Sequence, residues 1–479
     1  MEQKYEPVIG LEVHAQLKTK TKIFCGCSTV FGQEQNTSVC PVCLGLPGTL
    51  PVLNEKVVEL GVKTGLAFNC HIAGQFKFDR KNYFYPDLPK AYQISQFDKP
   101  LCYEGSIEIH VNGEDRKIEI VRAHLEEDAG KLLHDEQNRM SDSCVDYNRT
   151  GTPLLEIVSG PDLRSAEEAH AYLSCVKSIL KYLEVSDCNM QEGSLRCDAN
   201  ISVRLVGQDK LGVKTEIKNM NSFKAVEKAI NYEIKRQIEL IENGEKVVQE
   251  TRLWNADEGK TRSMRSKEEA HDYRYFPEPD LPYMRLDGAF IERLKATLPE
   301  LPHARFQRFV RDFKLSEYDA SVLTAEKDIA EYFETCVSIF SDAKTVSNWV
   351  MGDLMKALNE GNKSLSDNLV TPGRLAELLG LVKDQTISLR SAKVVFGEIF
   401  LTGKSAKSIV DEKGLVQISD TSALEKIVDD VIKKNPKSVA DFKGGQTKAI
   451  SFLMGQAMKM SQGKANPKLV NEMIKNKLS

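Results

Sequence analysis

Alternating hydrophobic and polar positions dominate the first 290 or so residues of the 479-residue chain, and they predict strands. Clear runs of this kind cover residues 106–111, 200–205 and 213–217. Apolar residues at helical spacing interrupt the strands at 165–183 and 223–243. Strands with a few long helices, and without regular βαβ alternation, predict an α+β domain with a mainly antiparallel sheet.

The pattern becomes helical from about residue 303, after a stretch at 298–302 that contains two prolines. Thr371 followed by Pro372 is typical of a helix N-terminus. A second junction is expected at 401–403, and the apolar residues from Leu424 onward again follow helical spacing. We therefore predict three domains, which are a sheet domain over 1–295, a helical domain over 296–402 and a helical tail over 403–479.

One segment of the predicted sheet domain carries a crowd of ionisable side chains. Residues 117–121 are β-branched and charged in alternation, as in a strand, and period two puts Val121, Ala123 and Leu125 on one face. The other face then carries four ionisable residues, Arg122, His124, Glu126 and Asp128. Carboxylates so close together are costly unless a cation lies among them, and Mg²⁺ prefers oxygen ligands. The alternative is a solvated strand end whose charges neutralise one another.

Further acids lie on other predicted strands. Glu12 and His14 share a face of an apolar N-terminal strand, and Glu156 stands in a run that reads as a buried strand. The segments 192–200 and 215–222, which include Glu192 and Glu216, are expected to add two more strands. Acids on neighbouring strands could assemble a Mg²⁺–ATP site, and no Walker G-x-x-x-x-G-K-[ST] sequence occurs. A hydrogen-bonded core histidine is the alternative for His14.

Four cysteines, Cys25, Cys27, Cys40 and Cys43, form two close pairs at the spacing of a structural zinc site. Four thiolates complete a tetrahedral shell and leave no open position, so we expect a zinc knuckle over 25–43 with a structural role. A redox pair at Cys40 and Cys43, or unligated thiols, are the alternatives.

Composition excludes several classes of protein. The net charge of −4 argues against a protein that coats nucleic acid uniformly, yet residues 442–479 carry +6, which leaves −10 for the rest. This basic segment indicates a polyanion contact or, equally, a pair of solvated Lys-rich helices. The start of the chain does not read as a signal peptide, and no apolar run approaches the roughly 18 residues of a membrane span. The 11 cysteines form no regular disulfide framework, so we expect a cytoplasmic protein.

Several long motifs resemble the B subunits of the tRNA-dependent amidotransferases. They lie at 8–14, 78–87, 122–130, 193–202, 218–223, 272–280 and 463–467. The resemblance implies a sheet domain similar to the glutamine synthetase and guanidino kinase fold. It also implies a heterotrimer with a glutaminase A subunit and a small C subunit, and contact with a non-discriminating aminoacyl-tRNA synthetase. Such a protein binds Glu-tRNA(Gln) and also Asp-tRNA(Asn), activates the side-chain carboxylate with ATP, and amidates it with ammonia from an internal channel.

The resemblance also implies roles for individual residues. The Mg²⁺ ligands and catalytic groups would be Glu12, His14, Glu126 and Glu156, with Glu127, Glu192 and Glu216 beside them. Phosphates or the aminoacyl end would be held by Arg196, Lys218, Asn219 and Arg274, and the ammonia path would be lined by Lys81, Tyr83 and Glu127. The tail would contact tRNA phosphates through Lys443, Lys448, Lys459, Lys464 and Lys468. Some members of the family lack the four cysteines, so zinc is expected to be structural.

Two other classes of function remain open from the residues. A non-enzymatic, zinc-stabilised RNA-binding or assembly protein would explain the cysteines and the basic tail but not the acids. A stand-alone phosphoryl-transfer enzyme would explain the acids but not the tail. No Gly-x-Ser-x-Gly nucleophile elbow occurs, so ammonia generation is expected in another chain.

Overall fold

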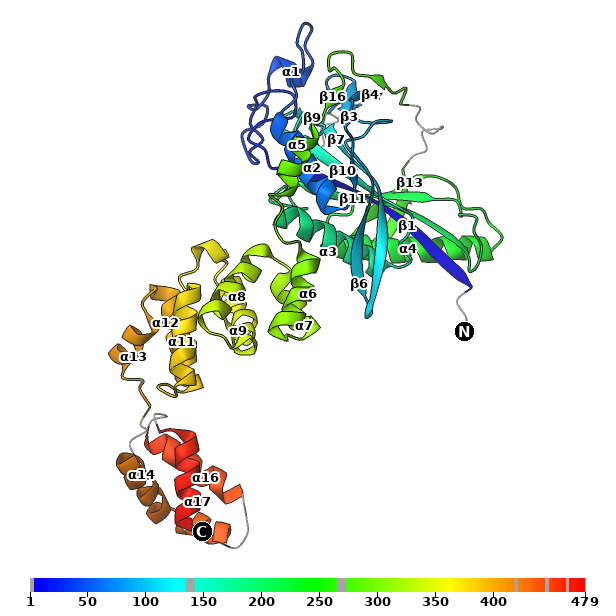
Figure 1. The fold of residues 1–479 in the computed structure, drawn as a ribbon. Helices are drawn as coiled ribbons and strands as arrows, with labels where there is room; N and C mark the ends of the chain where they lie inside the picture. Colours follow the sequence, from blue (N-terminus) through cyan, green and yellow to red (C-terminus); the bar gives the residue numbers. More distant parts are fainter. Residues whose placement is uncertain are drawn as a thin grey trace. The chain divides into compact units, whose positions relative to one another are not determined.

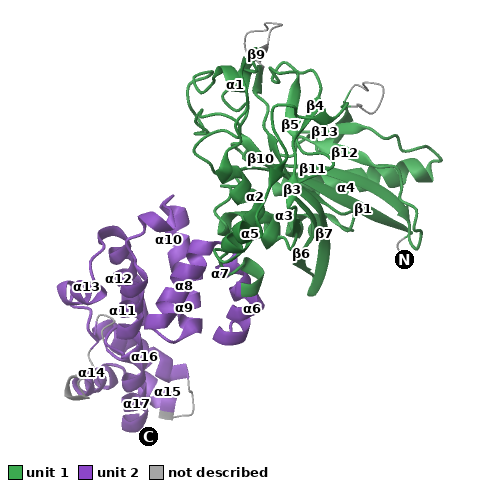
Figure 2. Ribbon diagram, turned by 45° about the horizontal axis from the view of Figure 1, so that its top comes forward, with its two compact units in different colours: residues 1–304 green, residues 305–479 purple. Residues whose placement is uncertain are grey.

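The computed structural model describes residues 4–134, 143–264, 273–417, 421–443, 448–461 and 465–478. The chain divides into two compact units, residues 1–304 and 305–479 (Figure 2). The first unit contains the sheet and the second is helical. This arrangement confirms the predicted α+β class.

The first unit is built on a nine-stranded sheet (Figure 1). Every neighbouring pair of strands is antiparallel except β12 and β13, which are parallel. In spatial order the strands are β14 (Lys260–Ser263), β13 (Thr251–Asn255), β12 (Thr215–Lys218), β11 (Leu195–Leu205), β1 (Tyr5–Gln16), β10 (Pro153–Ser159), β7 (Glu114–Glu127), β6 (Cys102–Val111) and β2 (His71–Ile72).

One face of this sheet is apolar and covered by helices. Ile9, Leu11 and Val13 of β1 are buried in the core, while Glu12 and His14 alternate with them and lie on the other face. The three helices that pack on the strands are α2 (Glu55–Ala67), α3 (Ala166–Tyr182) and α4 (Phe223–Glu242). The positions of α3 and α4 confirm the predicted helices, and each begins at a serine whose hydroxyl accepts a backbone N–H.

Strand β7 changes phase partway along its length. Ile118 and Ile120 are buried, and so are Ala123 and Leu125, whereas Val121 between them is 42% exposed. The register with β10 passes from Arg122 opposite Val158 to Ile120 opposite Ser159, so Val121 is the extra residue of a β-bulge. The prediction that Val121 shares the apolar face of Ala123 and Leu125 is therefore wrong, because period two does not continue through a bulge.

Smaller elements surround one end of the large sheet. They are α1 (Pro41–Leu44) and α5 (Gly288–Lys295), the sheet of β15 (Phe276–Pro277), β4 (Asp79–Asn82) and β5 (Tyr92–Ser95), and the pairs β16 (Met284–Arg285) with β3 (Gln75–Phe76) and β8 (Lys131–His134) with β9 (Ser143–Asp146). The pairing of β15 with β4 brings the 273–282 segment beside the 79–85 segment, although they are far apart in the sequence.

The second unit consists of helices around two separate apolar cores. Its first core is formed by α6 (Pro302–Phe313), α7 (Glu317–Thr324), α8 (Lys327–Ile339), α9 (Ala343–Trp349), the π-helical turn Val350–Leu354, α10 (Met355–Glu360), the 3₁₀ turn Leu365–Asp367, α11 (Pro372–Lys383), α12 (Leu389–Thr402) and α13 (Ala406–Lys413). The second core is formed by α14 (Thr421–Lys434), α15 (Pro436–Lys443), α16 (Lys448–Met460) and α17 (Pro467–Leu478).

Several details bear on the predicted domain boundaries. The Thr371 hydroxyl accepts the Arg374 N–H at 3.4 Å and caps α11, with Pro372 at its first position as expected. Helix α13 lies beyond the predicted boundary at 402, yet its Ile409 and Val410 pack into the first helical core. The division into three domains remains a prediction. Across the described ranges, no helix combines the length and apolar character that spanning a bilayer requires.

Candidate active site

A row of polar side chains crosses four neighbouring strands on the face of the sheet opposite the helices. Arg196 of β11 pairs with His14 of β1, His14 pairs with Glu156 of β10, and Glu156 pairs with His124 of β7. Directly opposed residues of antiparallel strands have side chains on the same face, within reach of one another. The register therefore assembles residues that lie far apart in the sequence.

The first carboxylate cluster consists of His14, Glu126 and Glu156, whose candidate ligand atoms all lie within 4.8 Å of one another. His14 Nε2 is 3.5 Å from Glu156 Oε2 and 3.9 Å from Glu126 Oε1. His124 Nε2 lies 3.3 Å from the same Glu156 oxygen and 3.9 Å from Glu126 Oε2. Both glutamates are buried, so their charges require neighbouring cations.

These contacts shift the ionisation of the cluster. Burial would raise the pKa of Glu156, but His124 and His14 hold it well below its usual range. Burial would likewise lower the pKa of His14, and hydrogen bonding and charge from Glu156, with the charge of Glu126, raise it overall. Opposite charges thus stabilise one another here, and the ionised forms of His14 and Glu156 are favoured.

A second carboxylate cluster adjoins the first and consists of Glu12, Asp198 and Glu216, again with ligand atoms within 4.8 Å. Here a lysine already neutralises part of the charge, because Lys218 Nζ is 2.6 Å from Asp198 Oδ2 and 3.0 Å from Glu216 Oε1. Asn200 donates to Glu12 at 2.8 Å. Burial raises the pKa of Glu12, and the carboxylates of Glu156 and Glu216 raise it further.

Two more cations face the clusters. Arg196 donates to Asp128 Oδ1 at 3.0 Å, and Asp128 is itself buried. Burial would lower the pKa of Lys81, but the charges of Glu126 and Glu156 raise it overall, so its ammonium stays charged beside the first carboxylate cluster. The face therefore offers anions for a metal and cations for phosphate oxygens.

Aromatic rings from the paired 79–85 and 273–282 segments surround Lys81. Its Nζ lies 4.8 Å from the Tyr273 ring centroid and 5.9 Å from that of Tyr83, and the two tyrosine rings are 6.0 Å apart. Gln93 accepts from the Tyr83 hydroxyl at 3.5 Å and donates to the Glu127 carbonyl oxygen at 2.6 Å. The three residues expected along the ammonia path, Lys81, Tyr83 and Glu127, are thus connected through contacts.

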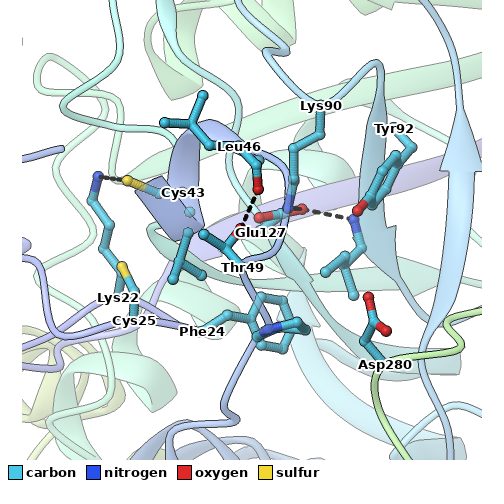
Figure 3. A pocket seen from close by; sticks show the side chains of 15 residues that line it. Lys22, Phe24, Cys25, Cys43, Leu46, Thr49, Lys90, Tyr92, Glu127 and Asp280 are labelled. Carbon is cyan, nitrogen blue, oxygen red and sulfur yellow. Dashed lines mark hydrogen bonds and ion pairs between the residues drawn. The ribbon is translucent and has the colours of Figure 1, made fainter. Parts of the chain in front are cut away.

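Glu127 points to the side of β7 away from Glu126. Its carboxylate forms an ion pair with Lys90 and accepts the Ile94 N–H at 2.8 Å. The side chains of Lys90 and Glu127 line a cavity of about 60 Å³, together with residues of the cysteine cluster (Figure 3). Glu127 is therefore separate from both carboxylate clusters.

Three residues expected in the site lie at its margin. Glu192 is exposed in a turn, because the strand expected over 192–200 begins only at Leu195, and it belongs to neither carboxylate cluster. Asn219 follows β12 and donates to the Trp254 carbonyl oxygen at 3.1 Å. Arg274 is exposed, and its carbonyl oxygen accepts from Asn82 at 2.8 Å.

A hollow of about 240 Å³ opens beside the second carboxylate cluster. Its lining combines Glu12 and Asn200 with Gly10, Ser159, Ser202 and Lys214. It is mostly lined by apolar groups and backbone, which is typical of a pocket for a flat organic ring with a few polar edges.

The four cysteines come together as their spacing predicts, with all four sulfur atoms within 4.8 Å of one another. Lys22 is fully buried next to them, and its Nζ lies 3.7 Å from Cys43 Sγ and 2.7 Å from the Ser38 carbonyl oxygen. Hydrogen bonding from Cys25 and the charge of Lys22 lower the pKa of the Cys43 thiol to about 4, against the effect of burial. Four sulfurs beside a buried ammonium fit a tetrahedral Zn²⁺ thiolate site.

The tail lysines expected on tRNA are only partly described. Lys448, Lys459 and Lys468 are exposed on α16 and α17. The side chain of Lys443 and the whole of Lys464 lie outside the described residues.

His124, Asp198 and Asp128 belong to the site although the sequence did not single them out as ligands or catalytic groups. Period two places His124 and Asp128 on the correct face, and Asp198 lies between Arg196 and Asn200 in a predicted strand. The missing information was the register between strands, since it places His124 opposite Glu156 of β10 and Asp198 opposite Glu12 of β1.

Comparison with known proteins gives a family for both parts of the chain. A family model described as the GatB/GatE catalytic domain matches residues 7–292, and one described as the GatB domain matches residues 331–478.

Individual relatives match over nearly the full length. A protein of Caldanaerobacter subterraneus subsp. tengcongensis is 59% identical over 99% of this chain and 100% of its own length. A protein of Thermodesulfovibrio yellowstonii is 58% identical over 98% of both chains. A protein of Moorella thermoacetica is 58% identical over 99% of this chain and 100% of its own. All three are named as the B subunit of an aspartyl/glutamyl-tRNA(Asn/Gln) amidotransferase. The resemblance seen in the motifs is confirmed, and the chain belongs to the GatB/GatE family.

Proposed function

We propose that this chain is the B subunit of a cytoplasmic, glutamine-dependent amidotransferase. It uses ATP to phosphorylate the side-chain carboxylate of Glu-tRNA(Gln) and of Asp-tRNA(Asn), and it amidates the activated acyl group with ammonia. A glutaminase A subunit supplies the ammonia and a small C subunit ties A to B. The full-length identity to relatives named as the B subunit of an aspartyl/glutamyl-tRNA(Asn/Gln) amidotransferase carries this proposal.

The first carboxylate cluster fits a divalent cation. Glu126 and Glu156 are buried oxygen donors whose nearest charged partners in the described structure are two histidines and the Lys81 ammonium. His14, Glu126 and Glu156 would hold one Mg²⁺. Glu12 and Glu216 would hold either a second ion or the Mg²⁺ that accompanies the bound ATP. Bound Mg²⁺ neutralises negative charge on the transferring phosphoryl group.

The activation step forms a bond between a carboxylate oxygen of the aminoacyl group and the γ-phosphorus of ATP. The bond from that phosphorus to the β–γ bridging oxygen breaks, and ADP leaves. Arg196 and Lys218 present cations on the same sheet face, where they can hold phosphate oxygens. The hollow beside Glu12 is large enough for the purine ring of the nucleotide. Asn219 and Arg274, at the margin of this face, would hold the aminoacyl end.

The amidation step forms a bond between ammonia nitrogen and the acyl carbon, and inorganic phosphate leaves with its electron pair. Contacts lead from the Glu127 carbonyl through Gln93 and Tyr83 to Lys81, which lies near Glu126 and Glu156, so ammonia that followed them would arrive beside the activated group. The rings of Tyr83, Tyr273 and Tyr275 pack edge to face in this region, where they would help to exclude bulk water. Shielding protects the acyl phosphate from hydrolysis.

The four-cysteine site would hold Zn²⁺ through Cys25, Cys27, Cys40 and Cys43. A closed thiolate shell crosslinks the loop between β1 and α2 and contributes folding energy without an open position for substrate.

The exposed lysines of α16 and α17 would contact tRNA phosphates. Such contacts release counterions, so affinity falls steeply as salt rises. Deleting residues 418–479 removes these helices but leaves α13 in its own core. The truncated complex should bind tRNA at least about tenfold more weakly at 0.1 M salt and with a shallower salt dependence. Equal affinities and slopes would mean that the lysines form only a solvated surface.

The deciding experiment measures ATP hydrolysis and amide formation by the purified heterotrimer with aminoacylated tRNA. We expect Mg²⁺-dependent hydrolysis that requires Glu-tRNA(Gln) and yields Gln-tRNA(Gln). Hydrolysis that ignores the tRNA would favour a stand-alone phosphoryl-transfer enzyme, and a lack of hydrolysis would favour an RNA-binding or assembly protein.

A further inference from the structure

The zinc knuckle packs directly against the Lys90–Glu127 ion pair. Helix α1 of the knuckle ends at Gly45, whose φ of 67° is left-handed. A Cβ atom at Gly45 would overlap Cγ of Lys90 and would lie 3.1 Å from its Cδ. The absence of a side chain at Gly45 therefore lets the aliphatic stem of Lys90 lie directly against the end of the knuckle helix.

A second contact joins the same two features from the other side. A Cβ atom at Gly151 would lie 3.6 Å from Cβ of Cys43, 3.5 Å from Cδ of Lys22 and 3.9 Å from Oε2 of Glu127. The Cys43 and Glu127 side chains thus pack around one backbone position. Figure 3 shows Cys43, Lys90 and Glu127 around the same cavity.

The ion pair depends on this support. Lys90 and Glu127 are both largely buried, with side chains 7% and 3% exposed. If Lys90 were displaced, the Glu127 carboxylate would keep one of its side-chain contacts in the described structure, the hydrogen bond from the Ile94 N–H. A buried carboxylate that loses its cation is strongly destabilised and rearranges or attracts water.

We propose that the zinc knuckle, through Gly45, holds Lys90 on Glu127 and thereby keeps ammonia delivery coupled to amide formation. Gly45 and Lys90 are positioning residues in this account, since neither touches the reacting atoms. The inference rests on the proposed function, in which Glu127 lines the ammonia path. It gives the zinc site a task beyond folding, because a disordered knuckle would release Lys90.

The test compares Gly45→Ala with Gly48→Ala in the purified heterotrimer. Both glycines are left-handed, with φ of 67° and 86°, so both substitutions strain the backbone. A Cβ at Gly48 meets nothing within 4 Å, whereas one at Gly45 meets Lys90. Gly45→Asn is a second variant, because asparagine tolerates left-handed backbone and keeps the overlap with less strain.

We expect both Gly45 variants to form about fivefold less amide per glutamine hydrolysed than Gly48→Ala, because a buried ion pair is broken. Amidation driven by added ammonium chloride should stay within about twofold of wild type, because the carboxylate clusters are untouched. Zinc content by elemental analysis should be unchanged, and hydrogen exchange at the Ile94 amide should become faster.

The inference is overturned if the Gly45 variants match Gly48→Ala both in amide yield per glutamine and in exchange at Ile94. Failure of the proposed function would look different. In that case the wild-type complex would not form amide from ammonium chloride in an ATP- and tRNA-dependent manner, whatever the variants do.

Discussion

The four-cysteine knuckle and the first carboxylate cluster both bring candidate ligand atoms within 4.8 Å of one another, but they do so by different means. The four cysteines lie within residues 25–43, around one short helix. The histidine and glutamates come from β1, β7 and β10, between positions 14 and 156. The knuckle is therefore a local structure, whereas the carboxylate cluster exists only when the sheet is formed in the correct register.

The two sites also differ in their chemistry. The four cysteine sulfurs, with the buried Lys22 beside Cys43, would leave no place for a substrate once they bind a metal. The first carboxylate cluster adjoins Arg196 and the second carboxylate cluster, which carries Lys218 and the hollow, so this face of the sheet has groups that can bind a nucleotide. Closed sulfur ligation is typical of structural sites, and an open oxygen-rich face is typical of phosphoryl transfer.

The largest effect should follow removal of a carboxylate-cluster ligand. His14→Ala or Glu126→Ala should lower amide formation by at least about 100-fold, because stabilisation of the transferring phosphoryl group is lost. Assembly of the heterotrimer and tRNA binding should persist, as measured by gel filtration and filter binding. Near-normal amidation would mean that the metal binds elsewhere, and that the first carboxylate cluster is not the catalytic site.

Replacing a knuckle ligand should act on stability first. Cys40→Ser should lower the melting temperature by about 5 °C and reduce bound zinc, because metal binding contributes to folding. Amidation from ammonium chloride at low temperature should fall much less than in His14→Ala. Wild-type protein that carries no zinc after metal-free handling would refute the assignment.

The second carboxylate cluster offers a matched pair of acids. Glu216→Gln should lower amide formation about tenfold, because Glu216 lies among Glu12, Asp198 and Lys218. Glu192→Gln should change it less than about twofold, because Glu192 is exposed outside both carboxylate clusters. Similar losses in both variants would show that Glu192 joins the site when substrate binds.

Among the residues of the site, the smallest effect is expected for His124→Gln, because His124 neighbours the first carboxylate cluster without belonging to it. His124→Gln keeps a donor toward Glu156 and should lower amide formation about threefold, whereas His124→Ala should lower it about tenfold. Binding of Mn²⁺ followed by electron paramagnetic resonance should weaken in the same order. Equal behaviour of the two variants would mean that His124 only fills space.

The sequence predicts the local four-cysteine site better than the carboxylate clusters, which depend on the register between strands. The spacing of Cys25, Cys27, Cys40 and Cys43 is a local signal, and the sulfur cluster follows directly from it. Period two predicts the faces of single strands, which placed Glu12 with His14 and His124 with Glu126. It cannot give the register between strands, so the contact of His124 with Glu156 and the joining of Asp198 to Glu12 could not be predicted.

Two further differences between the predictions and the structure have physical causes, one local and one tertiary. The strand expected from Glu192 begins three residues later, because Gly193 has a φ of 80° and sits in a turn. Helix α13 lies beyond the boundary expected at 402, yet it packs on α11 and α12, and its Ile409 and Val410 belong to the first helical core. Tertiary packing of this kind leaves no mark in a short window of residues.

The bulge at Val121 has a consequence for how this site tolerates change. Before it, the even-numbered Ile118 and Ile120 face the core, and after it the odd-numbered Ala123 and Leu125 do. If the bulge were lost and Val121 paired with β10 as a regular strand residue, the even-numbered ladder from Arg122 to Asp128 would turn toward the apolar layer. The bulge thus determines which side chains face the site, together with the residue types of the strand. Substitutions at Val121 that keep the bulge should be well tolerated in descendants of this chain, whereas changes that force Val121 into regular pairing with β10 should be eliminated.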